Sequence, residues 1–387
     1  MAFPTNWVRK CILTIQSSEV PGNLSNYPVL FTEDNLPSEM FDADGSYPAL
    51  SGGGDIRFSS DADGSTQLAC EVVTFTTDND PANGVAEIYV KVPSVSSSVD
   101  TDIYVWYNKS GESQPAETDT YGKHNVWDSD YQLVMHMNDE TTSTLLDSTS
   151  NSHDATKKAA NEPVEATGVI GEGQDFDGTN DYAATASAND SLNIIDTLTI
   201  EAIIKPSKLI NSSNPGYVTI VSRQQEPTSS LDSYALHINP SGKLHFASYG
   251  GNIQGTQVSW ASGTAYHIAG TYNSTGLIGN LYVDGVVETL TVDNYDAMAG
   301  GTNALSIGAN DYSTAAQCFP GIIDELRISD VIRSADWLET SYNNQDNPAT
   351  FIIEGTPETH IGDSSPFLLF VNGLGGNTLG GNCSLMG

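Results

Sequence analysis

Three aspartates of the sequence lie where a hard cation could bind. Asp177 and Asp181 enclose a Gly-Thr-Asn turn, and Asp324 lies within an apolar, strand-like stretch at 319–329. Calcium prefers several oxygen ligands from carboxylates and backbone carbonyls, and the turn offers both if Asp324 lies across from it. We therefore expect a structural calcium ion at Asp177, Asp181 and Asp324. The alternative is that Asp177 and Asp181 only stabilise the turn and that Asp324 caps backbone amides.

The sequence contains no recognisable catalytic set. Asp324 and Glu325 are adjacent, so on a regular strand they point to opposite faces and cannot act as the carboxylate pair of a glycoside hydrolase. A Gly-x-Ser-x-Gly elbow, a His-Glu-x-x-His helix and a phosphate loop are absent as well. Four histidines lie in strand-like stretches, where satisfied sheet positions are expected rather than ligands or bases: His136, His237, His245 and His267. We predict that the protein is not an enzyme.

The charge of the chain excludes two classes of partner. Its 387 residues include 14 Lys and Arg against 49 Asp and Glu, which gives a net charge of −35. Nucleic acid and anionic membranes would be repelled by this charge. No apolar run approaches the roughly 20 residues of a transmembrane helix, so membrane insertion is not expected. The length suffices for two domains, each with a core of its own.

The four cysteines show no C-x-x-C spacing, which argues against a zinc site and a redox motif. They are Cys11, Cys70, Cys318 and Cys383. Cys11 and Cys70 lie in strand-like stretches of the first half of the chain. They either pair with each other or remain as buried free thiols.

The elements that must position these residues are mostly short strands. From 7 to 120, alternating residues are broken by Gly, Pro, Asn and Asp without helical periodicity, which is typical of a β-sandwich. After a polar connector at 112–123, the same pattern resumes. One helix is predicted at 334–342, because Ser334 can cap it and three apolar side chains share a face. We expect this helix to pack on the second sandwich and 348–354 to form its closing strand.

Two stretches of the second half resemble a known family. They are Gly-Glu-Gly-Gln-Asp-Phe-Asp-Gly-Thr-Asn-Asp-Tyr at 171–182 and Phe-Pro-Gly-Ile-Ile-Asp-Glu-Leu-Arg-Ile-Ser at 319–329. Together with the order of the other strands, they resemble the laminin-G-like and concanavalin-A-like lectin and glucanase sandwich domains over about 126–356. The resemblance implies an all-β fold in which this domain is an antiparallel jelly roll.

The first half is similar to a bacterial domain family of unknown function that commonly precedes such domains. The similarity covers about 5–123 and includes Trp-Val-Arg-Lys at 7–10, Asn-Tyr-Pro-Val-Leu at 26–30 and Ile-Tyr-Val-Trp-Tyr at 103–107. The expected organisation is therefore an N-terminal β-sandwich at 1–123, a concanavalin-A-like sandwich at 124–357 and a Gly-rich apolar tail at 358–387. A short helix precedes the tail.

Sugar binding is the activity that the lectin resemblance implies. Carbohydrate sites combine an aromatic ring with amides or carboxylates that hold hydroxyl groups. Loops of the second domain supply five candidates of these types: Tyr249, Asn252, Trp260, Asn310 and Tyr312. We expect a glycan as the ligand, with no enzymatic turnover.

The apolar tail suggests a docking segment. Phe367, Leu368, Leu369 and Phe370 follow one another in a Gly- and Asn-rich context, and such a patch has little reason to stay in water. The first domain begins close to Met1 without a leader-like segment. We therefore expect a multi-copy structural protein of a virion, exposed on its surface and attached through the tail. The alternative is a secreted bacterial surface protein that binds glycans, or an accessory module of a polysaccharide hydrolase.

Overall fold

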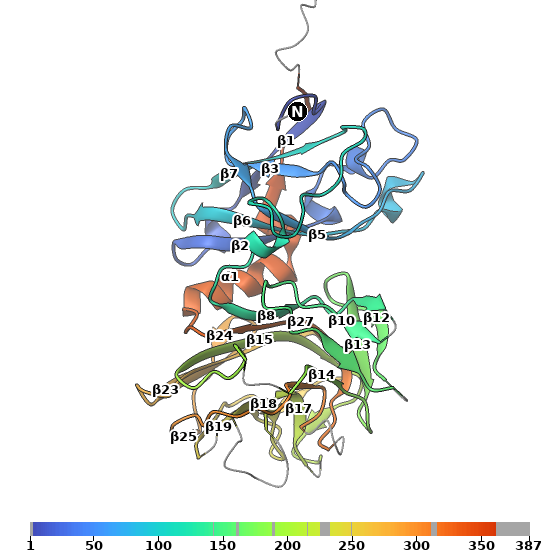
Figure 1. Cartoon of the computed structure of the whole chain (residues 1–387). Helices are drawn as coiled ribbons and strands as arrows, with labels where there is room; N and C mark the ends of the chain where they lie inside the picture. Colours follow the sequence, from blue (N-terminus) through green and yellow to red (C-terminus); the bar gives the residue numbers. More distant parts are fainter. Residues whose placement is uncertain are drawn as a thin grey trace, which may run out of the picture.

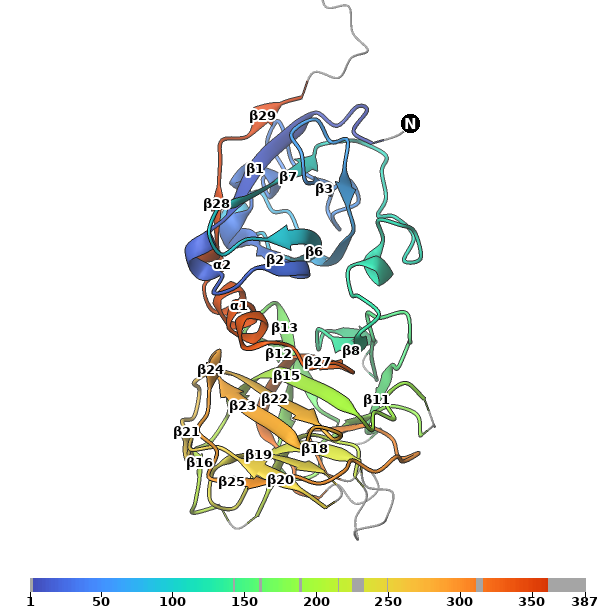
Figure 2. The same cartoon turned by 90° about the vertical axis from the view of Figure 1, so that its left-hand side faces the viewer.

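The structure is a computed structural model that describes residues 3–141, 143–159, 162–187, 190–214, 216–224, 233–248, 250–310 and 316–360. Two β-sandwiches lie one above the other, with a helix between them (Figures 1 and 2). The all-β fold class predicted from the strand patterns is confirmed. The α-helices of the described residues are α1 (Ala335–Asp346) and α2 (Pro348–Phe351), and five short 3-10 helices accompany them.

The first sandwich has a six-stranded and a three-stranded antiparallel sheet. The larger sheet has the order β28-β1-β7-β3-β4, with β29 also pairing with β1, and the smaller has the order β2-β6-β5. The bounds are β1 Arg9–Ile15, β2 Leu24–Thr32, β3 Arg57–Ser59, β4 Gln67–Leu68, β5 Cys70–Phe75, β6 Ala86–Val95, β7 Thr101–Tyr107, β28 Ile352–Glu354 and β29 Glu358–Thr359. Alternate residues of β1 are buried, which places Cys11, Leu13 and Ile15 in the core.

The second sandwich is built from two larger sheets. One has the order β12-β13-β27-β15-β22-β23-β24, with β8 also pairing with β27, and the other has the order β25-β20-β19-β18-β17-β26-β14-β11-β10-β9. The bounds of the first are β8 Tyr131–Met135, β12 Val164–Thr167, β13 Glu172–Asp177, β15 Thr197–Pro206, β22 Tyr266–Asn273, β23 Ile278–Val283, β24 Val286–Val287 and β27 Pro320–Ser329. Those of the second are β9 Asp139–Thr141, β10 Thr144–Leu145, β11 Ala155–Lys157, β14 Ala183–Ala184, β17 Val218–Ser222, β18 Tyr234–Ile238, β19 Leu244–Ser248, β20 Asn252–Gln254, β25 Val292–Asn294 and β26 Ser306–Ile307. A small ribbon pairs β16 (Ile210–Asn211) with β21 (Ser259–Trp260).

The predicted helix is confirmed, but it extends further and contacts both sandwiches. The hydroxyl of Ser334 accepts a hydrogen bond from the backbone N–H of Trp337 at 3.1 Å, as expected of an N-cap. The amide side chain of Asn344 bonds to both backbone groups of Leu30 in the first sandwich. On the other side, Gly285 of the second sandwich lies against Glu339 and Tyr342. α1 therefore packs on the second sandwich as expected, and it packs on the first sandwich as well.

The segment predicted to close the second sandwich instead joins the first. β28 pairs with β1 through Leu13↔Glu354, Thr14↔Ile353 and Ile15↔Ile352. β29 continues along β1, so 358–359 is a strand of the first sandwich rather than part of a tail. The alternation of apolar and polar residues shows which side chains of a strand are buried, but it does not specify the neighbouring strand with which the strand pairs. The first sandwich is thus completed by residues that lie on the far side of the second in the sequence.

A single apolar core spans the boundary between the sandwiches. The core cluster of the first sandwich includes Trp127, Tyr131, Ile203 and Ala269 of the second, together with Trp337 and Leu338 of α1. The other core cluster lies between the two sheets of the second sandwich. The two sandwiches are therefore held together by buried apolar area, in addition to two chain connections.

A β-bulge in β27 overturns one expectation about the acidic pair. The register against β15 shifts between Glu201↔Arg327 and Ile203↔Asp324, and Glu325 has a φ of +49°. A bulge re-aims side chains and breaks the alternation of faces. Ile323 and Leu326, on either side of the pair, both belong to the core between the sheets of the second sandwich. Asp324 and Glu325 consequently both lie on the outer face, so the inference that they point to opposite faces is wrong.

The described cysteines are free thiols. Cys11, Cys70 and Cys318 are buried and form no disulfide, so Cys11 and Cys70 do not pair. Burial raises the pKa of the Cys11 thiol to about 12 and that of Cys70 to about 11, which keeps both protonated. Cys383 lies outside the described residues. Within the described ranges, no helix is long and apolar enough to cross a membrane.

Candidate functional site

A pocket of about 180 Å³ lies on the outer face of the sheet that contains β17, β18 and β19. Leu236 and Ile238 of β18 point into the core, so His237 between them points outward. His245 of β19 is the register partner of His237 and lies beside it. The described lining residues are Tyr217, Gln224, His237, His245, Ala247, Asn310 and Gln317.

Three aromatic rings form the floor and one wall of the pocket. The two imidazoles are stacked, with centroids 4.9 Å apart and an interplanar angle of 14°. The ring of Tyr217 lies 5.0 Å from His237 and 5.6 Å from His245. Tyr217 is 36% exposed, whereas the two histidines are 4% and 5% exposed. The phenol ring is therefore the aromatic surface that a ligand can reach.

Both histidines are neutral at physiological pH. Burial, and then the neighbouring His245, hold the pKa of His237 well below its usual value. Burial lowers the pKa of His245 to about 4, although the neighbouring side chain of Asn252 favours the charged form. Both ring nitrogens of His237 and Nδ1 of His245 have no hydrogen-bond partner among the described residues. Unpaired buried polar atoms are costly, and these nitrogens lie beneath the surface that a ligand reaches.

Amide side chains complete the pocket. Gln224, Asn310 and Gln317 line it, and the hydroxyl of Ser222 donates to Oδ1 of Asn310 at 3.0 Å. An amide offers both donors and acceptors, as does a sugar hydroxyl. A reachable phenol ring with neutral imidazoles and amides around it is suited to an uncharged, hydroxyl-rich ligand.

The structure brings one of the five predicted sugar-binding residues, Asn310, into the lining of this pocket. Asn252 of β20 is the register partner of Ala247, which lines the pocket, but Asn252 itself does not line it. Trp260 does not take part: it is 0% exposed, and its indole N–H donates to the carbonyl of Gly242 at 2.8 Å. A fully buried ring cannot stack on a sugar from solvent. Tyr249 and Tyr312 lie outside the described residues.

Tyr217, His237 and His245 were not identified as site residues from the sequence. The expectation that strand histidines are satisfied within the sheet is wrong for His237, whose ring nitrogens are unpaired. One signal was present. Two histidines occupy the polar positions of consecutive alternating strands joined by a short Asn-Pro-Ser-Gly turn, which is the pattern of a hairpin that places them side by side.

The three predicted calcium ligands are not brought together. Asp177 pairs with Pro320 in the register of β13 and β27, so Asp324 lies four residues further along β27. Four residues of strand correspond to about 13 Å. Oδ2 of Asp324 instead accepts hydrogen bonds from the backbone N–H groups of Val169 and Ile170 at 2.8 and 3.0 Å. Asp324 is therefore a cap for backbone amides and does not face the turn.

The aspartates of the turn mostly stabilise its backbone. Oδ1 of Asp177 accepts from the N–H groups of Thr179 and Asn180, and Oδ2 of Asp181 accepts from the N–H of Asp177. Oδ1 of Asp181 is buried without a partner among the described residues. Calcium at this turn stays a prediction, now without Asp324 as a ligand.

The comparisons with known families agree with the fold. Residues 177–339 match the model of the concanavalin A-like lectin/glucanases superfamily. Residues 52–156 match a domain of unknown function (DUF2341), so this match extends beyond the predicted boundary at 123 into β8, β9, β10 and β11 of the second sandwich. The second sandwich is therefore a concanavalin A-like domain preceded by a domain of the other family. No curated protein matches the chain.

Several solved structures are similar to parts of this chain at low sequence identity. One is domain 4 of AbnA, an extracellular arabinanase from Geobacillus stearothermophilus, in complex with arabinotriose (TM-score 0.35, 18% identity, 47% of this chain and 81% of that chain). Another is Trypanosoma rangeli sialidase in complex with the inhibitor DANA (TM-score 0.42, 11% identity, 70% of this chain and 44% of that chain). A third is the binding domain of Paraclostridial Mosquitocidal Protein 1 (TM-score 0.44, 13% identity, 56% of this chain and 53% of that chain). These likenesses concern the fold alone.

Proposed function

We propose that the protein binds an uncharged glycan through the pocket of Tyr217, His237 and His245. The observation that carries the proposal is the reachable ring of Tyr217 beside the amide side chains of Gln224, Asn310 and Gln317 in one pocket. Sugars present both an apolar face for stacking and hydroxyl groups for hydrogen bonding. Because the described lining has no charged side chain and the chain carries a net charge of −35, acidic polysaccharides are disfavoured.

The pocket supports binding rather than hydrolysis. Glycoside hydrolases generally use two carboxyl groups that flank the scissile bond. No Asp or Glu is among the described residues that line this pocket. A lectin-like role without turnover is therefore the function that the geometry supports best.

The proposal is tested by replacing Tyr217 with alanine and measuring binding to a panel of neutral polysaccharides by isothermal titration calorimetry. The expected result is at least a ten-fold loss of affinity, because the only reachable ring of the described lining is removed. Tyr104→Ala is the control, since Tyr104 lies half-buried on β7 of the first sandwich. Unchanged affinity in Tyr217→Ala, or release of sugar by the wild-type chain, would contradict the proposal.

The pH dependence of binding gives a second measurement on the same site. The folded-state pKa of His245 is about 4, below the usual value near 6.5, so the neutral form persists through that interval. Binding is expected to stay constant between pH 8 and 6 and to decline as the pH approaches 4. A decline centred near pH 6.5 would show that the histidines are not buried as described.

We further propose that the protein presents this pocket on the surface of a virion, in many copies. Support comes from the arrangement of the chain: His360, the last described residue, packs on Trp106 of the first sandwich, whereas the pocket lies in the second sandwich. Many copies would give avidity to a weak site. A secreted bacterial surface protein, or an accessory module of a polysaccharide hydrolase, is the alternative setting.

The setting is tested by deleting residues 364–387, which include Phe367, Leu368, Leu369 and Phe370 and lie outside the described residues. The shortened chain is expected to be monomeric in size-exclusion chromatography with light scattering, and to retain glycan affinity. Assembly that is equal to that of the full chain would remove the docking role of this segment.

A further inference from the structure

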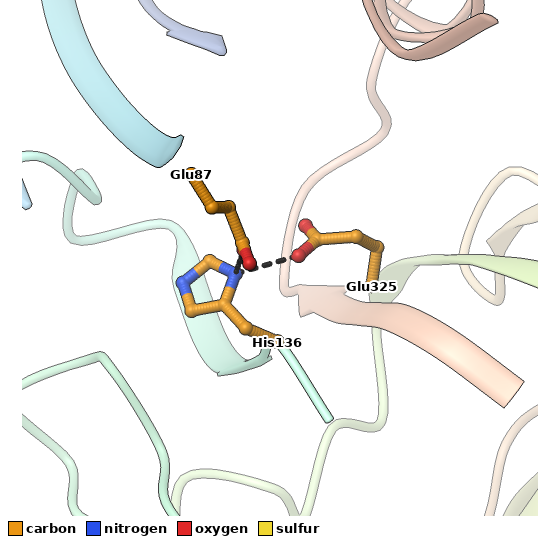
Figure 3. Close-up of side chains that lie close together, drawn as sticks. All are labelled: Glu87, His136 and Glu325. Carbon is orange, nitrogen blue, oxygen red and sulfur yellow. Dashed lines mark hydrogen bonds and ion pairs between the residues drawn. The ribbon is translucent and has the colours of Figure 1, made fainter. Parts of the chain in front are cut away.

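A second polar cluster lies buried between the two sandwiches. It consists of Glu71 of β5, Glu87 of β6, His136 directly after β8, and Glu325 at the bulge of β27, and we call it the interdomain cluster. Their side chains are between 0% and 7% exposed. Figure 3 shows Glu87, His136 and Glu325 pointing toward one another from three separate segments. A cleft of about 310 Å³ between the sandwiches reaches Glu71 and His136.

The outer atoms of the cluster have partners that fix its orientation. Nε2 of His136 lies 3.3 Å from Oε2 of Glu71, which also accepts from the indole N–H of Trp127 at 2.7 Å. The hydroxyl of Ser148 donates to the other oxygen of Glu71 at 2.6 Å. A carboxylate that holds one imidazole nitrogen as N–H leaves the lone pair on the other, which is the arrangement found behind metal-binding histidines.

Glu325 is held in the same way. Its Oε2 accepts from the hydroxyl of Tyr89 at 2.8 Å and from Nη2 of Arg327 at 2.6 Å. Its Oε1 forms a hydrogen bond with Nδ1 of His136 at 2.7 Å, which a metal ion bound by both atoms would replace. The hydrogen-bonding partners thus satisfy the outer atoms of both residues and leave Nδ1 and Oε1 on the inside.

Glu87 has no such partners. Both of its carboxyl oxygens are buried without a hydrogen bond among the described residues. Oε1 lies 3.2 Å from Nδ1 of His136, a contact at ion-pair distance that lacks hydrogen-bond geometry. Gly171 leaves the space beside Oε2, because a Cβ at this position would collide with that oxygen. A buried carboxyl with two unpaired oxygens requires either a proton or a cation.

The charges around Glu87 favour a cation. Three buried carboxyl groups, those of Glu71, Glu87 and Glu325, lie within 3.3 Å of one imidazole, and the guanidinium of Arg327 pairs with Glu325 alone among them. The ligand atoms of Glu87, His136 and Glu325 all lie within 4.8 Å of one another. Ligand atoms that each lie about 2.1 Å from one ion are about 3 to 3.4 Å apart. Nδ1 of His136 lies 3.2 Å from Oε1 of Glu87 and 2.7 Å from Oε1 of Glu325, which is close to this separation.

We propose that Glu87, His136 and Glu325 bind one divalent transition-metal ion, of the Zn²⁺ or Mn²⁺ type, between the two sandwiches. An imidazole nitrogen with two carboxylates suits these ions, whereas calcium takes six to eight oxygen ligands. Glu87 comes from the first sandwich, and His136 and Glu325 come from the second. The ion would therefore cross-link the sandwiches, a role that is independent of the glycan pocket.

The alternative is a metal-free cluster in which a protonated His136 is shared among the carboxyl groups and Glu87 keeps its proton. The full chain, stripped with a chelator, distinguishes the two at pH 7.5. Titration with ZnCl₂ or MnCl₂ is expected to give one ion per chain by calorimetry and by mass spectrometry of metals, with a rise of the Tm by mass action. A wild-type chain that takes up neither ion and shows no change of Tm at millimolar metal overturns the proposal.

Glu87→Gln is the diagnostic variant, since it preserves volume and Glu87 accepts no hydrogen bond that would be lost. Metal affinity is expected to fall at least ten-fold, and His136→Asn, as a second variant, is expected to give the same loss. Glu201→Gln is the matched control: Glu201 is buried beside His267, with Nε2 and Oε2 3.6 Å apart, but it is outside the triad.

Equal metal binding in Glu87→Gln and the wild type would mean surface binding and would also overturn the proposal. Calcium is titrated in parallel. If calcium uptake is lost in Asp181→Asn and retained in Glu87→Gln, the calcium ion binds at the turn Asp177–Asp181 and not in the interdomain cluster. Because none of these readouts uses a glycan, failure here leaves the proposed lectin role untouched.

Discussion

Replacing Arg327 with methionine is expected to lower the free energy of unfolding by about 3–5 kcal/mol. Arg327 is 2% exposed, and its Nη2 lies 2.6 Å from Oε2 of Glu325. Its guanidinium also lies over the rings of Tyr89 and Trp127, at 5.1 and 5.2 Å from their centroids. Removing it leaves the buried carboxylate of Glu325 without its cation, and desolvated charges without a partner are among the costliest defects in a protein.

Urea unfolding of both proteins in the presence of chelator measures this effect without a contribution from bound metal. Lys123→Met is the control, because its partner Glu117 is 63% exposed at a distance of 2.9 Å. Exposed ion pairs contribute about 0–1 kcal/mol, so the control should unfold almost as the wild type does. If Arg327→Met also lost less than about 1 kcal/mol, the interdomain cluster would not be the buried ionic network described.

Replacing Trp260 with alanine is expected to cost about 3–5 kcal/mol of stability and to leave glycan affinity unchanged. The indole is fully buried, packs edge-to-face on Tyr266 at 5.1 Å and donates its N–H to the backbone of Gly242. The variant therefore loses packing and leaves a carbonyl without its donor. Thermal unfolding gives the loss of stability, and affinity is measured well below the lowered Tm.

Tyr217→Ala is expected to show the opposite pattern, with weak glycan binding and little change in Tm, because its ring is partly exposed. The two variants together separate an aromatic residue of the core from one of the site. Loss of affinity in Trp260→Ala at a temperature where the chain is fully folded would show that Trp260 contributes to the ligand site after all.

The sheets and the helix follow from local patterns that the sequence displays directly. The alternation of apolar and polar residues places Leu13 and Ile15 on the buried face of β1. The N-cap hydrogen bond between Ser334 and Trp337 fixes the start of α1. Strand pairing over long distances does not follow in this way. The pairing of β28 with β1 depends on the three-dimensional return of the chain, and nothing in 352–354 distinguishes that partner from a strand of the second sandwich.

The candidate sites were harder to predict for the same reason. The four residues of the interdomain cluster come from four separate segments, and Glu325 enters it only because a bulge turns its side chain. Asn252 and Asn310 could be proposed from residue type and loop position. Tyr217 could not, because its role depends on the outward faces of two neighbouring strands.

The return of β28 and β29 to β1 also determines how the molecule would carry a mechanical load. β7 and β28 flank β1 on its two sides, and the chain connects the two sandwiches twice, once after β7 and once through α1 (Figure 2). Tension between a sugar held in the second sandwich and the chain beyond His360 would run along the backbone of α1, α2, β28 and β29. Because β28 and β29 pair with β1, part of this load would pass into the larger sheet of the first sandwich through their backbone hydrogen bonds.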